Sequence, residues 1–296
     1  MPSQFTIIDV PSILGLRPTG VEYLPEALKA AGLIERLNAD YAGRVSPLPY
    51  NSERDKVTLL LNPDSIKTFS LQLANRVSSV IRSRRYPIVL GGDCSIPIGN
   101  LLVLRCLGRY GLFFIDGHAN FYQPEASLTG EVADMDLAIV SGRGLDVLTN
   151  INNLKPLVRD QDIILFGYRY REQAASFGCQ DVRNTDINSF DLTYVKELGN
   201  TTAASDAVKK LLNDELLGFW IHIDADVLDD SIMPAVDYRL NGGLSFDELS
   251  ELLKIIVESD RSVGMDITIF NPNFDSDGSI AHRFVLSVLE GLSFIK

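Results

Sequence analysis

The sequence has few cysteines, fewer basic than acidic residues and no long apolar run. Its three cysteines, at positions 94, 106 and 179 of 296 residues, form no paired spacing such as CxxC. This argues against a disulfide framework and predicts a reduced, cytoplasmic compartment. No apolar run approaches the roughly 18 residues that cross a bilayer. Residues 1–10 lack the basic and then apolar order of a signal peptide. We therefore expect neither a membrane span nor a secretion signal.

The charge balance narrows the range of partners. The 27 Lys and Arg residues are outnumbered by 39 Asp and Glu residues, which gives a net charge of −12. Nucleic acids and anionic membranes are bound by basic surfaces. Neither is therefore expected as the main partner.

The chain does contain enough apolar sequence for a large core, since 46% of its residues are hydrophobic. Short runs rich in Val, Ile and Phe alternate with stretches of helical period, which predicts a parallel sheet with helices on both faces. Strands are expected at residues 5–10, 86–90, 112–116, 163–166, 218–224 and 262–270. Helices are expected at 24–31, 65–82, 95–105, 203–217, 245–258 and 279–292, with a capping box of Ser245 and Glu248 at the start of one of them. No linker or repeat is visible, so residues 1–296 are interpreted as a single α/β domain.

Polar clusters follow the predicted strands at their carboxyl ends. They are Gly91-Gly-Asp-Cys-Ser95, Asp116-Gly-His-Ala-Asn120, Asp224-Ala-Asp-Val-Leu-Asp229 and Asn271-Pro272. Ligands of open parallel sheets bind outside the carboxyl ends of the strands. We therefore expect the clusters to meet at one edge of the sheet.

Two of these clusters alternate metal-type side chains. Asp116, His118 and Asn120 are spaced by two residues, as are Asp224 and Asp226, and this spacing puts side chains on one face of a strand. Buried acids at this density are costly unless a cation lies between them. Oxygen ligands with one imidazole suit Mn(II), Zn(II) or Fe(II). The alternative is that these acids cap helices and pair with arginines.

In order along the chain, these motifs resemble the arginase/agmatinase (ureohydrolase) family. Similar matches are Gly20-Val-Glu-Tyr-Leu-Pro25, Ala31-Gly-Leu33, Gly242-Gly-Leu-Ser245 and Met265-Asp-Ile-Thr-Ile-Phe-Asn-Pro272. The resemblance implies a three-layer α/β/α fold with a mainly parallel sheet of about eight strands. It also implies hydrolysis of a linear C–N bond by metal-activated water, with two Mn(II) ions in the family's site.

The resemblance also assigns the ligands one by one, and one half of the site departs from the family. One ion would take Asp116, His118, Asp224 and Asp226, all of which match. The second would take a His, two Asp and a bridging Asp, which fall on Cys94, Asp116, Asn120 and Asp224. An amide is a weaker donor than a carboxylate, and a thiolate favours Zn(II) or Fe(II) over Mn(II). Three outcomes stay open: one ion, a second softer ion through Cys94, or none. Mn(II) and a single ion are the first choice, with Zn(II) or Fe(II) as alternatives.

Other positions bear on catalysis and substrate. The family's proton-shuttle His falls on Ala133 and its guanidinium-binding Glu on Ile269. Loss of that carboxylate favours a modified or neutral group over a plain guanidinium. The predicted catalytic set is Asp116, His118 and Glu131, in which Glu131 or Asp134 serves as acid or base. Predicted substrate contacts are Tyr122, Thr129 and Glu172. His222 is predicted to orient a ligand carboxylate.

Three functions follow as hypotheses. The first is a metal-dependent hydrolase of a guanidino, N-hydroxyguanidino, amidine or amide group in a small-molecule substrate. The second is a non-catalytic arginase-like protein that serves as a binding or assembly module, because four catalytic positions differ together. The third is an amidase with Cys94 as nucleophile, which needs a base beside the thiol. Family members also predict a homo-oligomer.

Overall fold

The computed structural model describes residues 5–169, 175, 176 and 178–293. Eight strands form one sheet in the order β2-β1-β3-β8-β7-β4-β5-β6, and every neighbouring pair is parallel. The strands are β1 Phe5–Asp9, β2 Asp40–Arg44, β3 Tyr86–Leu90, β4 Gly111–Ile115, β5 Ile163–Phe166, β6 Asn188–Phe190, β7 Phe219–Asp224 and β8 Ser262–Thr268. The predicted sheet of about eight parallel strands is confirmed.

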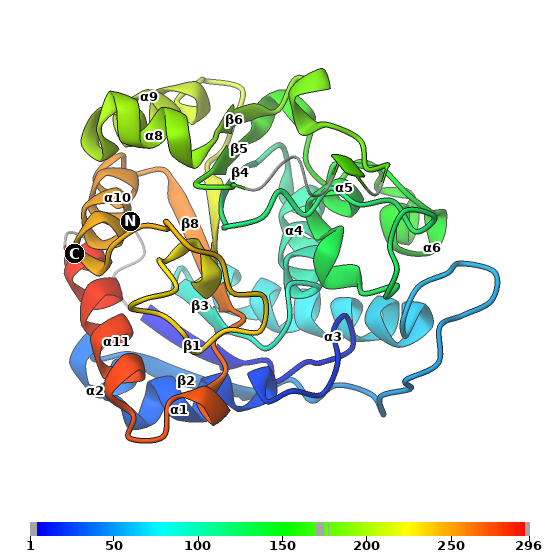
Figure 1. Cartoon of the computed structure of the whole chain (residues 1–296), viewed down its shortest axis with the longest axis horizontal. Helices are drawn as coiled ribbons and strands as arrows, with labels where there is room; N and C mark the ends of the chain where they lie inside the picture. Colours follow the sequence, from blue (N-terminus) through cyan, green and yellow to red (C-terminus); the bar gives the residue numbers. More distant parts are fainter. Residues whose placement is uncertain (1–4, 170–174, 177, 294–296) are drawn as a thin grey trace.

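Helices cover both faces of this sheet, which gives the predicted three-layer α/β/α arrangement (Figure 1). One layer contains α3 Pro63–Arg82, α4 Ile96–Leu107, α5 Asp136–Val140 and α6 Asp146–Thr149. The other contains α1 Leu24–Ala30, α2 Leu33–Leu37, α8 Leu192–Leu198, α9 Asn200–Leu211, α10 Phe246–Glu258 and α11 Ser279–Leu292. Within the described residues, no helix has both the length and the apolar character to span a bilayer.

The core is divided by the sheet into two apolar clusters. Alternate residues of the central strands enter each one, as on β4, where Phe113 packs in one cluster and Phe114 in the other. The central strands β3, β4 and β7 are buried at every position, which is why apolar residues fill nearly all of them, with His222 and Asp224 of β7 as exceptions.

The predicted capping box is present at the start of α10, where Ser245 and Glu248 each accept the other's backbone N–H. Most predicted bounds lie within a few residues of the observed ones. The expected helix at 203–217 differs more, since α9 spans Asn200–Leu211. The edge strands β2 and β6 were not predicted. The order β3-β8-β7-β4 places the carboxyl ends of four central strands, and the polar clusters that follow them, next to one another.

Candidate metal centre

The chain turns directly after β4. That strand ends at Ile115, so Asp116 is the first residue beyond it and not its last. Asn120 has a φ of +45°, a left-handed conformation that asparagine tolerates better than most residues. Strand-type alternation is therefore not what brings these side chains together. Gly117 permits the turn, because a Cβ there would lie 2.6 Å from the carbonyl oxygen of Asp226.

Three side chains form a first potential metal-binding group. One ligand atom each from Asp116, His118 and Asp226 lies within 4.8 Å of the other two. Nδ1 of His118 is 2.8 Å from Oδ2 of Asp226, and the backbone N–H of His118 donates to Oδ1 of Asp116 at 2.6 Å. Asp224, the last residue of β7, accepts the Asp226 N–H at 2.8 Å within its own segment, and its charge acts on Asp116. Three of the four predicted ligands of the first ion therefore meet at ligand spacing, and Asp224 lies beside them.

Burial concentrates negative charge in this group, since Asp116, Asp224 and Asp226 are each no more than 3% exposed. The pKa values of Asp116 and Asp224 are raised well above their ordinary range, first by burial and then by neighbouring carboxylates. Burial acts on Asp226 too, but His118 and Arg169 outweigh it and hold the pKa of Asp226 below its ordinary value. A divalent cation would supply the missing positive charge, and three carboxylates with one imidazole are a donor set that fits it.

The two altered positions each bond a carboxylate of this group. The thiol of Cys94, which is 1% exposed, donates to Oδ2 of Asp224 at 2.9 Å, and its Sγ lies 3.1 Å from Oγ1 of Thr268. Nδ2 of Asn120 donates to Oδ2 of Asp116 at 2.7 Å. Burial first, and then the charge of Asp224, raises the pKa of the Cys94 thiol well above its ordinary value. A protonated thiol is a poor nucleophile, which argues against the Cys94 amidase.

His222 lies two residues before Asp224 on β7 but bonds a different carboxylate. Its Nδ1 is 2.5 Å from Oδ2 of Asp266, the residue it faces in the register of β7 and β8. Its ring stacks on Phe114 of β4, with centroids 4.3 Å apart. His222 was predicted to orient a carboxylate of the metal-ligand set. The carboxylate that it bonds belongs to Asp266, which is not a predicted ligand, so this prediction is wrong.

A cavity of about 470 Å³ opens onto these side chains. Among the residues that line it are the predicted ligands Cys94, His118, Asn120, Asp224 and Asp226 and the predicted substrate contacts Tyr122 and Thr129. Glu172 lies outside the described residues. The cavity is therefore the place where a substrate could meet the ligands.

Of the two loop carboxylates, Asp134 lines the cavity and Glu131 does not. Glu131 is fully buried, forms an ion pair with Arg17 at 3.0 Å and accepts the hydroxyl of Tyr238. The pKa of Asp134 is raised to about 7, first by burial and then by the charge of Glu131. A group that titrates near neutral pH is suited to proton transfer. The geometry thus favours Asp134 over Glu131 for that step.

Two departures from the resemblance lie on the cavity wall. Ala133 and Ile269 line it in place of an imidazole and a carboxylate. Ile269 has a φ of +70°, which is strained for a β-branched residue. The wall is apolar at both positions, so neither supplies a proton shuttle or an anion.

Arg169 is a site residue that sequence reasoning missed. Its guanidinium donates to the carbonyl oxygens of residues 226, 227 and 228, and also to those of Leu240 and Asn241. It therefore ties the segment after β7 to a second loop on the cavity wall. Nothing in the sequence near Arg169 signals a contact with residues about 60 to 70 positions away.

Comparison with known proteins gives consistent matches over nearly the whole chain. The model of the arginase family matches residues 3–293. An arginase from Staphylococcus aureus (strain MRSA252) is 29% identical over 287 residues, which cover 94% of this chain and 93% of that protein. The structure of an arginase from Bacillus caldovelox superposes with a TM-score of 0.89 at 27% identity, and each chain is covered to 97%. An arginase structure from Bacillus cereus gives a TM-score of 0.86 at 27% identity, again with 97% of each chain covered.

Proposed function

The chain belongs to the arginase family, and from that premise we propose that it is a metal-dependent hydrolase of a linear C–N bond in a small molecule. The observation that carries the proposal is the group of Asp116, His118 and Asp226, with Asp224 beside it, of which His118, Asp224 and Asp226 line the cavity. These are the four residues that would hold the ion, and Mn(II) is the first choice for their oxygen-rich set.

When bound, the ion would act as a Lewis acid that lowers the pKa of water and offsets the negative charge developing on the substrate. The remaining steps belong to the side chains of this protein. Asp134 accepts the proton of the attacking water and returns it to the leaving nitrogen, as its pKa of about 7 allows. Glu131 acts on this step through its charge, which raises the pKa of Asp134, and not by touching the substrate.

The cavity wall supports a substrate with little positive charge at the reacting group. Ile269 provides no carboxylate to pair with a cation, so an N-hydroxyguanidino or amide group fits better than a plain guanidino or amidine group, both of which are cationic at neutral pH. Tyr122 and Thr129, with Glu172, are proposed to contact the rest of the substrate. The three free cysteines support a reducing, cytoplasmic setting, and we propose a homo-oligomer.

A non-catalytic binding module is the second candidate, and one observation favours it. Cys94 and Asn120 donate hydrogen bonds to Asp224 and Asp116, so two of the buried carboxylates are partly satisfied without any cation. In that case the cavity would bind a small molecule without converting it.

Metal content and turnover separate these candidates. The protein, dialysed and then loaded with Mn(II), would be incubated with guanidino, N-hydroxyguanidino, amidine and amide compounds, and the released urea, hydroxyurea, amine or ammonia would be measured. The hydrolase proposal predicts turnover of at least one class, loss of ion and activity in Asp226→Asn, and no change in Asp214→Asn, which replaces an exposed carboxylate. A protein that binds Mn(II) but converts no compound of any class would support the binding module instead.

A further inference from the structure

We propose that Cys94, His222 and Asp224 form a second metal site for a thiophilic divalent ion, with Zn(II) as the first choice, and that this site shares Asp224 with the first ion. The inference goes beyond the proposed reaction, because it concerns which ion the altered half of the pocket binds. His222 is the new element, since the family resemblance assigns it no ligand role.

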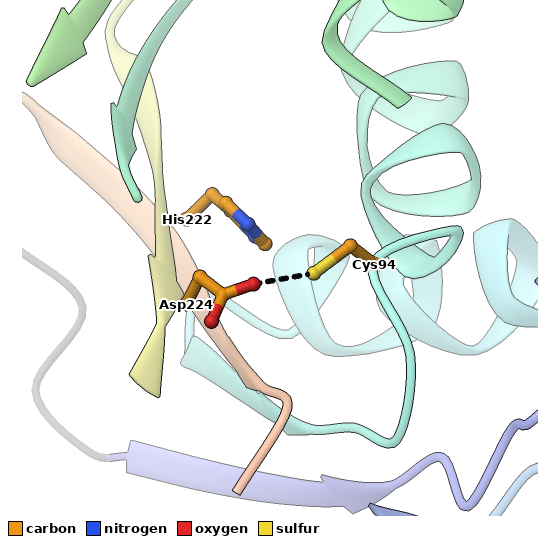
Figure 2. Close-up of side chains that lie close together, drawn as sticks. All are labelled: Cys94, His222 and Asp224. Carbon is orange, nitrogen blue, oxygen red and sulfur yellow. Dashed lines mark hydrogen bonds between the residues drawn. The ribbon is translucent and has the colours of Figure 1, made fainter. Parts of the chain in front are cut away.

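The three side chains already stand at ligand spacing. One ligand atom each from Cys94, His222 and Asp224 lies within 4.8 Å of the other two, and all three residues are buried. Figure 2 shows His222 and Asp224 projecting from β7 toward Cys94, whose thiol bonds Oδ2 of Asp224. Cys94 follows β3, so the ligands come from two separate parts of the sheet edge.

The hydrogen bond to Asp266 decides which imidazole nitrogen is free. A carboxylate accepts and cannot donate, so Nδ1 of His222 carries the proton in its bond to Oδ2 of Asp266. Nε2 is left with its lone pair. A carboxylate that fixes one nitrogen of a histidine while the other binds metal is the usual arrangement around protein zinc ions.

Nε2 of His222 has no hydrogen-bond partner among the described residues, and the whole residue is 0% exposed. A buried polar atom without a partner is costly, and such atoms are rare unless a water molecule or an ion satisfies them. An ion at the Cys94–Asp224 pair would satisfy it.

The imidazole is also held rigidly. Phe114 stacks on one side of the ring, and the β7–β8 register places Asp266 beside it. Asp266 is fixed in turn by two further donors, Nε1 of Trp220 and Nδ2 of Asn100. A ligand fixed in this way loses little conformational freedom on binding an ion, which favours affinity.

The donor chemistry selects the ion. A thiolate, an imidazole and a carboxylate together favour Zn(II) or Fe(II) over Mn(II), because the sulfur is soft. Binding releases the thiol proton of Cys94 to solvent. Cys94 and Asp224 line the cavity, so a fourth coordination position would face it.

Cobalt spectroscopy tests the site without any substrate. The full-length protein would be stripped with a chelator and titrated with Co(II), because a thiolate bound to Co(II) gives a charge-transfer band in the near ultraviolet that oxygen and nitrogen ligands do not give. We expect this band in the wild-type protein and in Cys106→Ser, which changes an exposed cysteine, and its loss in Cys94→Ser. In parallel, Zn(II) content should fall by one ion per chain in Cys94→Ser and His222→Gln but not in His282→Gln, which changes an exposed histidine.

The two proposals fail separately. Asp226→Asn should abolish the ion of the first group and keep the cobalt band. Absence of the band in folded wild-type protein, or its persistence in Cys94→Ser, would overturn the second site and leave the hydrolase proposal intact. Far-ultraviolet circular dichroism identifies any variant that does not fold. If Cys94→Ser does not fold, Cys94→Ala takes its place, since it changes only a small buried side chain. The presence or absence of the cobalt band in the wild-type protein tests the site without any variant.

Discussion

Asp134→Asn should stabilise the metal-free protein at alkaline pH and leave its stability unchanged at acidic pH. Asp134 lies in the cavity wall beside Glu131 and accepts a hydrogen bond from Oγ1 of Thr129 at 3.3 Å. Burial and the charge of Glu131 raise the pKa of this carboxyl from 3.8 to about 7. Asparagine resembles the protonated form, and its amide oxygen can still accept from Thr129.

The sign and size of this effect follow from proton linkage. Between pH 3.8 and about 7 the folded protein holds a proton on Asp134 that the unfolded chain has released, so stability falls as pH rises through this window. Each tenfold difference in proton affinity is worth about 1.4 kcal/mol, so the interval corresponds to a penalty of about 4 kcal/mol above pH 7. Asp134→Asn removes the penalty.

Urea unfolding in the presence of a chelator measures this effect. The variant and the wild-type protein should unfold with similar free energies near pH 4, while near pH 8 the variant should be more stable by up to about 4 kcal/mol. Asp186→Asn, which changes an exposed carboxylate, is the matched control and should show no pH-dependent difference. A stability difference for Asp134→Asn that is the same at both pH values would refute the reasoning.

Four other outcomes are expected. Mn(II) at about 100 times its dissociation constant should stabilise the wild-type protein by about 2.7 kcal/mol but not Asp226→Asn, as thermal melting would show. The double variant Cys94→His with Asn120→Asp should bind more Mn(II) per chain than the wild-type protein in elemental analysis, since it supplies a harder donor set. Gly117→Ala should destabilise the fold by roughly 1–3 kcal/mol in urea, because its Cβ would lie 2.6 Å from the carbonyl oxygen of Asp226. Ser245→Ala should cost about 1 kcal/mol in the same assay by removing the N-cap of α10.

The architecture could be predicted where burial leaves a continuous apolar signal. The strands β3, β4 and β7 are buried throughout, and their apolar residues identified them. The strand β2 Asp40–Arg44 has no fully buried residue, and β6 Asn188–Phe190 has only one. Among the described residues, each of these edge strands pairs with a neighbouring strand on one side only. Their polar residues are compatible with that exposure, and a search for apolar runs therefore does not find them.

The candidate site could likewise be predicted only in part. Asp116, His118, Asp224 and Asp226 could be located because the carboxyl ends of neighbouring strands meet at one edge of a parallel sheet. The partners of the loop residues around the cavity could not be located. The bond between Glu131 and Tyr238, for example, joins residues 107 positions apart and depends on how two loops fold over the cavity.

The bond between His222 and Asp266 has a consequence for the order in which these residues could have arisen. Asn100 and Trp220 both donate to Oδ1 of Asp266, whereas Oδ2 is bonded by His222. Without Asp266, His222 would be a fully buried imidazole with neither nitrogen paired, and without a donor at position 222, the buried Oδ2 of Asp266 would lose its partner, so either loss costs about 1–3 kcal/mol. In any lineage that avoided these costs, the aspartate and the histidine were gained together.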